Sequence, residues 1–132
     1  MTTDIGLLHF SHAELACKGT GIVKLAEGFG QWIDEIRISW DKPLTVNSCC
    51  RSVEHNKAVG GVPNSYHLFD LPGRDFDTCA VDFAISANQR REFVAMILRK
   101  FPDASIGIAK TFVHVDRRNH YDGSPPTLFT YG

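Results

Sequence analysis

Apolar residues recur at helical spacing between Ile22 and Ile38. Most of them lie three or four positions apart, as in one stripe of an amphipathic helix. The stripe consists of Ile22, Leu25, Phe29, Trp32, Ile33 and Ile36. Gly28 and Gly30 interrupt it, and each glycine weakens a helix by up to about 1 kcal/mol. The pattern predicts a helix over residues 22–38 whose stability depends on tertiary packing.

A second helical pattern opens at Ser86, which forms a capping box with Gln89 three residues later. The predicted helix runs to Lys100, and Pro102 prevents its continuation. Its expected core face consists of Phe93, Val94, Ile97, Leu98 and Phe101. A shorter helix is predicted over residues 53–59, with Ser52 as its N-cap.

Short apolar runs between turn-forming residues predict five strands. They cover residues 44–49, 78–84, 105–109, 112–116 and 128–131. Helices and strands mix without a strict alternation, which favours the α+β class. We expect a mainly antiparallel sheet packed against helices.

The composition indicates an ordinary globular protein. The chain has 132 residues, of which 43% are hydrophobic, and its formal net charge is −1. This length fits a single domain over residues 1–132. A near-neutral charge offers no basic face for nucleic acid, and no run approaches the ~20 apolar residues of a membrane span. Residues 1–10 lack the features of a signal peptide, so we expect synthesis in the cytoplasm.

The chain contains four cysteines, and no two of them form a C-x-x-C pair. This spacing disfavours a four-cysteine zinc site. Cys49 and Cys50 are neighbours on a predicted strand, so their side chains point to opposite faces. In a protein made in the cytoplasm, buried free thiols are the expected state.

Two strands and one loop carry candidate metal ligands. In the strand 112–116, His114 and Asp116 share a face, because side chains alternate along a strand. Asp82 lies in an apolar strand, where a carboxylate needs a partner, and His67 follows a loop of turn formers. Two histidines and one aspartate would leave a zinc ion one open position, which is the arrangement of catalytic zinc sites. Water held there becomes a nucleophile near neutral pH.

Several motifs resemble the D-Ala-D-Ala carboxypeptidase-like zinc peptidases, which share a fold with the amino-terminal signalling domain of hedgehog. They are RSVEHN at 51–56, VGGVPNSYH at 59–67, CAVD at 79–82, FVHVD at 112–116 and FSHAELAC at 10–17. The resemblance covers about residues 8–118 and leaves 119–132 as a tail. It implies this fold, zinc as the cofactor and a stem peptide of bacterial peptidoglycan as the substrate.

The same resemblance assigns roles to individual residues. It makes His67, Asp82 and His114 the zinc ligands. Arg51 matches an arginine near the metal that binds a substrate carboxylate or the developing oxyanion, although it also suits bracing of the loop. Ser65 suits either a hydrogen bond that supports a ligand or the shaping of the turn.

This chain departs from the family pattern in the spacing between His67 and Asp82, which is longer than in relatives. The additional polar residues lie between Leu68 and Thr78 and include Asp75 and Asp77. Either of these aspartates could replace Asp82 as a ligand. The match of the AVDF strand favours Asp82.

A second departure concerns the general base. Many relatives carry an acidic residue three positions before the second metal histidine, where this chain has Thr111. Asp116 is then the candidate base, but the same position also suits orientation of His114 or pairing with Arg117. Glu54 and His120 are further candidates for the base.

The expected activity is that of a zinc metallopeptidase, either a carboxypeptidase or an endopeptidase. The alternative is a non-catalytic zinc-containing binding or structural module of the same fold. The combination of a wall substrate with no export signal favours a phage endolysin or a virion component. The oligomeric state is not predicted.

Overall fold

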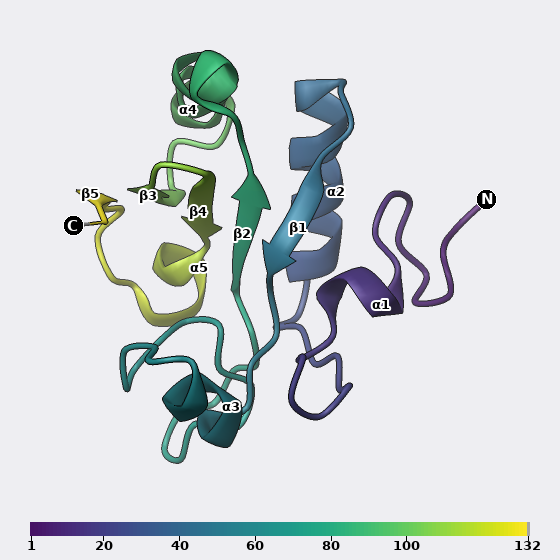
Figure 1. The fold of residues 1–132 in the computed structure, drawn as a ribbon, viewed down its shortest axis with the longest axis vertical. Coiled ribbons are helices and arrows are strands. Elements are labelled where there is room, and N and C mark those ends of the chain that lie inside the picture. The colour runs from purple at the N-terminus through teal and green to yellow at the C-terminus, as the bar shows by residue number, and fades with distance from the viewer. Residues whose placement is uncertain (132) are drawn as a thin grey trace.

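The computed structural model describes residues 1–131 and shows one small α+β domain built on a five-stranded sheet. The strand order is β1-β2-β4-β3-β5, visible from right to left in Figure 1. The strands are β1 (Thr45–Ser48), β2 (Ala80–Ala84), β3 (Ser105–Ile108), β4 (Phe112–Asp116) and β5 (Leu128–Thr130). The first three pairings in this order are antiparallel, whereas β5 lies parallel to β3. The sheet is therefore mixed, and all five predicted strands are present with slightly shorter ends.

Five helices occur within residues 1–131. They are α1 (His12–Leu15), α2 (Phe29–Trp40), α3 (Val53–Ala58), α4 (Ala87–Lys100) and α5 (Arg118–Asp122). In the described part of the chain, no helix combines the length and the apolar character needed to cross a membrane.

The two faces of the sheet have different environments. Val113 and Val115 of β4 are fully buried, as are Val81 and Phe83 of β2. These residues belong to the same core cluster as the buried sides of α2 and α4. The rings of Phe83 and Phe93 meet at a centroid distance of 6.0 Å. Since alternate residues point to opposite faces, Asp82, His114 and Asp116 lie on the other face of β2 and β4.

The prediction of a helix from residue 22 was wrong for its first part. Residues 22–28 are not helical, and Leu25 forms a parallel β-bridge with Thr78. Gly28 has φ of 81° and is the N-cap of α2. A left-handed conformation is natural for glycine and ends the possibility of helix continuing through it. Ile22 and Leu25 belong to an extended segment, in which Leu25 packs against the core whereas Ile22 is 39% exposed.

Two details of α4 also differ from the prediction. Ser86 is the N-cap, but its side chain makes no capping hydrogen bond. Leu98 is 50% exposed, and Met96 takes a buried position beside Phe93. The helix is therefore rotated slightly from the face that its apolar spacing indicated.

Two other local expectations are confirmed. Ser52 caps α3 by accepting a hydrogen bond from the backbone of His55. The prediction of free buried thiols holds for Cys17, Cys49, Cys50 and Cys79. The prediction that Cys49 and Cys50 lie on a strand was wrong, because β1 ends at Ser48, and both side chains are buried just beyond it.

Candidate metal centre

Asp82 and His114 face each other across the central strands of the sheet. They are directly paired residues of β2 and β4, so their side chains project from the same face. His114 Nδ1 lies 2.9 Å from Asp82 Oδ1. This is the polar face, opposite the valines that fill the core.

The third residue, His67, comes from the loop that follows α3. A parallel bridge between Arg51 and Leu68 holds this loop, and the Arg51 amide donates to the His67 carbonyl at 2.9 Å. His67 Nε2 lies 3.2 Å from Asp82 Oδ1. The Ser65 hydroxyl accepts a hydrogen bond from the His67 amide. Ser65 therefore shapes the turn that presents the ring.

Hydrogen bonds on the outer sides of both imidazoles determine which nitrogens face inward. His67 Nδ1 lies 2.7 Å from the backbone carbonyl oxygen of Cys49. His114 Nε2 lies 2.7 Å from Asp116 Oδ2. Since these oxygens only accept, each outer nitrogen carries the proton. A neutral imidazole in this orientation presents its lone pair inward, which is the ligand state of histidine, whereas a protonated ring donates from its inner nitrogen to Asp82.

This donor set fits a zinc ion. His67, Asp82 and His114 each offer one ligand atom, and these atoms lie within 4.8 Å of one another. The two nitrogen-to-oxygen distances, 2.9 and 3.2 Å, are close to the ~3.3 Å that separates ligands on a tetrahedral zinc with bonds of about 2.0–2.1 Å. Two lone pairs and a carboxylate oxygen converge, and a cation satisfies all three.

Burial and charge shape the titration of the three groups. Burial lowers the pKa of His67, against the opposing influence of Asp82. For His114, burial favours a lower pKa, but the hydrogen bonds to Asp116 and Asp82 outweigh burial. The pKa of His114 is therefore raised. Although burial alone would raise it, the two imidazoles hold the pKa of Asp82 well below its usual range. The aspartate is therefore ionised at neutral pH.

Arg51 lies at the edge of the metal ligands in a fixed position. Its Nη2 lies 3.6 Å from Asp82 Oδ2. Nε donates to the Ser48 hydroxyl at 3.1 Å, and Nη1 donates to Asn56 Oδ1 at 3.2 Å. A guanidinium held on three sides is preorganised to receive an anionic group.

Asp116, the candidate general base, lies behind His114 and is fully buried. Arg118 donates to both of its oxygens, from Nε at 2.9 Å and from Nη2 at 2.7 Å. The cationic partner of Asp116 is therefore Arg118, whereas Arg117 lies over the rings of Trp32 and Tyr121.

The three ligands open into a cleft of about 680 Å³. It is lined by Arg51, residues 59–67, Asp82, Phe112, His114, Arg118, Phe129 and Tyr131. Within residues 1–131, Asp82 is the only carboxylate in this lining. The other candidates for the base, Glu54 and His120, line separate pockets. Thr111, which stands where many relatives carry an acidic residue, is exposed.

The comparisons with known proteins identify a family. A family model described as Peptidase M15 matches residues 8–116, which is more than half of the chain. The chain belongs to the peptidase M15 family. Members of this family are zinc-dependent hydrolytic peptidases, and the cluster of His67, Asp82 and His114 can hold the metal. Comparison with curated proteins and with solved structures gives no match.

In this M15 chain, the insertion at residues 69–77 braces the turn before His67. Arg74 donates from Nη1 to the carbonyl of Ser65 and from Nη2 to that of Asn64, each at 2.8 Å. The insertion therefore supports the first ligand through the backbone on which that ligand is carried.

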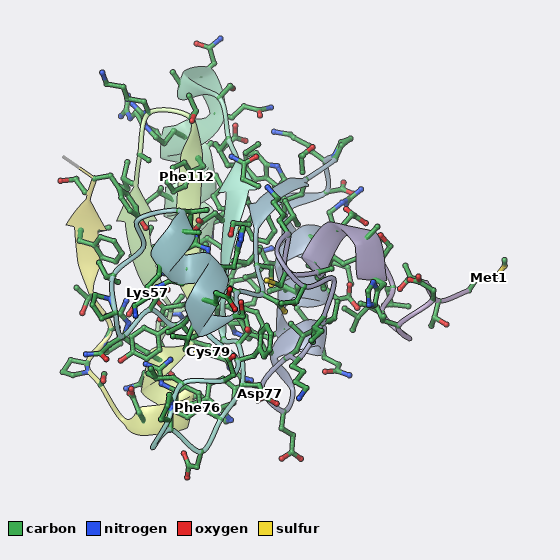
Figure 2. The ribbon with its side chains drawn as sticks, turned by 60° about the horizontal axis from the view of Figure 1, so that its bottom comes forward. Met1, Lys57, Phe76, Asp77, Cys79 and Phe112 are labelled. Carbon is green, nitrogen blue, oxygen red and sulfur yellow. The ribbon has the colours of Figure 1, made fainter. Side chains whose placement is uncertain are left out.

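The aspartates of the insertion lie away from the ligands. Asp75 and Asp77 line a pocket that also contains Glu27 and His120. In Figure 2, Asp77 lies well apart from Phe112, which lines the metal cleft. The alternative in which one of these aspartates replaces Asp82 is therefore not favoured by the M15 structure.

Sequence reasoning missed four residues of the M15 site: Asn56, Arg118, Phe129 and Tyr131. Asn56 lies in the RSVEHN motif, but nothing in the motif showed that it binds Arg51. Phe129 and Tyr131 belong to the segment interpreted as a tail, which instead forms a wall of the cleft. The alternation of Leu128 to Tyr131 was the available signal, since it places both rings on one face.

Proposed function

We propose that this chain is a zinc-dependent peptidase that hydrolyses a peptide bond in the stem peptides of bacterial peptidoglycan. The observation that carries the proposal is the orientation of the two imidazoles. The outer nitrogens of His67 and His114 hydrogen-bond to the Cys49 carbonyl and to Asp116, and the inner nitrogens of both rings converge on Asp82. Such an arrangement serves a metal, and the three protein ligands leave one position for chemistry.

A zinc ion held by these residues would supply Lewis-acid chemistry, polarising a carbonyl group and lowering the pKa of water. The chain's own residues hold and orient the reactants. Arg51 receives a substrate carboxylate or the oxyanion that develops during attack. Its contacts with Ser48 and Asn56 fix the guanidinium before substrate arrives.

Asp116 acts in this proposal as a positioning residue. Its carboxylate is fully buried and accepts hydrogen bonds from both His114 and Arg118. A base must reach the proton that it removes, and this carboxylate lies behind His114 and does not line the cleft. It fixes the tautomer of His114 and increases the basicity of that ligand.

A non-catalytic metal-containing module is the second candidate, and one observation favours it. Within residues 1–131, the cleft has no carboxylate besides the ligand Asp82. Zinc peptidases usually use such a group for proton transfer. The two candidates share the metal site and differ only in turnover.

The deciding experiment measures metal content and wall hydrolysis together. We expect about one zinc ion per chain in the wild type, and its loss in His67→Ala. The exposed His9→Ala is the matched control and should retain the metal. Purified stem peptides and intact wall should be cleaved by wild type and His9→Ala alone. Zinc binding without cleavage of any wall type would support the non-catalytic module, and failure to bind zinc would contradict both candidates.

A further inference from the structure

The C-terminal strand places two aromatic rings beside the metal ligands. Phe129 of β5 pairs with Gly107 of β3, which in turn pairs with His114 of β4. Paired residues share a face of the sheet, and the ring centroids of Phe129 and His114 are 5.6 Å apart. Tyr131 lies two residues further, with its ring 5.1 Å from that of Phe112. The rings form one wall of the cleft.

Gly107 allows these rings to lie close to the sheet. A Cβ atom at this position would lie 2.5 Å from Phe129 Cε2 and 2.9 Å from Tyr131 Cε2. Real Cβ contacts are longer, so any side chain here would push both rings outward. The absence of a side chain at Gly107 thus sets the depth of the cleft beside His114.

An apolar loop forms the other side of the same cleft. Val59 and Val62 are 55% and 68% exposed, and Pro63 follows them. Asn56 anchors the loop by donating to the Val62 carbonyl at 2.8 Å. Apolar walls with a few polar groups at the base are typical of a site that binds a ligand.

The charged groups of the cleft determine which substrate side chain fits. Arg51 lies beside Asp82, and Arg118 is bound to Asp116. Within the described chain, no free carboxylate lines the cleft to receive a cationic side chain. The surface that remains for a side chain is apolar and aromatic.

We propose that Phe129 and Tyr131 are specificity-determining residues that bind an uncharged apolar side chain of the substrate next to the scissile bond. This inference rests on the proposed peptidase function. Both residues lie beyond the region matched by the family model, residues 8–116, so this wall is a feature of the chain's own C-terminal segment. Burial raises the pKa of Tyr131 to about 12, and its hydroxyl therefore stays protonated as a donor.

The first test uses steady-state kinetics on an alanine-containing stem peptide with zinc-loaded protein. Phe129→Ala and Tyr131→Ala should each raise KM about tenfold, the effect of a lost apolar contact, with zinc content unchanged. Leu128→Ala is the matched control, because Leu128 lies on the same strand but pairs with the core-facing Ile106. Its KM should stay at the wild-type value. An unchanged KM in both aromatic variants would overturn the inference.

The second test does not depend on turnover. Calorimetry compares two hydroxamates that chelate zinc and differ by one methyl group, the hydroxamates of N-acetylglycine and N-acetylalanine. Wild type and Leu128→Ala should bind the alanine probe about tenfold more tightly, and the aromatic variants should lose this preference. If the wild type prefers the alanine probe but cleaves no stem peptide, the proposed peptidase function is refuted, whereas the role of Phe129 and Tyr131 in binding is retained. If the wild type shows no preference for the alanine probe, the role of Phe129 and Tyr131 in side-chain binding is refuted, even if stem peptides are cleaved.

Folding of the variants is monitored by circular dichroism and by zinc content. Phe129 is half-buried, whereas Tyr131 is 47% exposed. If Phe129→Ala does not fold, Tyr131→Ala decides the outcome, because truncation of an exposed ring leaves the core intact.

Discussion

Asp116 lies directly behind His114, with its Oδ2 2.7 Å from Nε2 of the imidazole. The same carboxylate accepts two hydrogen bonds from the Arg118 side chain. In the proposed function this acid, two residues from a metal ligand on the same strand face, supports that ligand. A positioning role and a catalytic role of Asp116 predict different effects of its substitution, so experiment can distinguish the two roles.

Asp116→Asn should weaken zinc binding about 10–100-fold, as loss of a charged partner of a metal histidine does. The amide preserves the shape of the side chain but not its charge, so the basicity of His114 falls. Zinc affinity is measured by competition with a chromogenic chelator. Asp103→Asn, at an exposed position, should bind zinc as the wild type does. Full zinc affinity with a collapsed kcat would instead make Asp116 a catalytic base.

Removal of zinc should lower the thermal stability of the protein. The three ligands are buried, and without a cation the inner nitrogens of both imidazoles share a single oxygen of the Asp82 carboxylate. A ligand present at a thousandfold its Kd stabilises the folded state by about 4 kcal/mol. Thermal unfolding followed with and without a chelator should show a lower Tm for the stripped wild type, whereas His67→Ala should show no change. Equal Tm values for both wild-type samples would contradict a zinc site coupled to folding.

Asn56→Ala should impair both the stability and the substrate site. The buried Asn56 side chain accepts from Arg51 and donates to the Val62 carbonyl. Its removal leaves these groups unpaired at a cost of about 1–3 kcal/mol and releases the guanidinium. Denaturant unfolding and stem-peptide kinetics should both change, while zinc content stays constant. The exposed Asn88→Ala is the control. Wild-type kinetics in Asn56→Ala would show that fixation of Arg51 is not needed.

Arg74→Ala should weaken zinc binding although Arg74 does not contact the ligands. Its guanidinium joins the insertion to the carbonyls of Ser65 and Asn64, just before His67. It also lies over the Tyr66 ring at 4.9 Å. Without the Arg74 side chain, the turn that carries His67 has more conformational freedom. Zinc binding must then order this turn, and the entropy cost lowers the zinc affinity. The chelator assay should show this loss in Arg74→Ala and not in Arg91→Ala, which changes an exposed arginine of α4. Unchanged affinity would make the insertion irrelevant to the metal.

Local patterns in the chain determine much of the architecture. Short apolar runs between turn-forming residues located all five strands, including the strand that carries His114. Ser52 was identifiable as a cap because its hydroxyl serves an amide only three residues away. The prediction for α2 failed at its start because apolar spacing does not distinguish a helix from an extended segment packed on the core, as Leu25 is.

The candidate metal ligands could be identified from the amino-acid sequence alone, because the motifs around His67, Asp82 and His114 resemble those of zinc peptidases. The sequence did not determine the role of Asp116, the support that Arg74 gives, or the wall formed by Phe129 and Tyr131. Those depend on strand register and on contacts between segments far apart in the chain, such as β5 against β3. The physical reason is that local patterns report only which face a side chain takes, whereas burial and pairing across the fold decide what it touches.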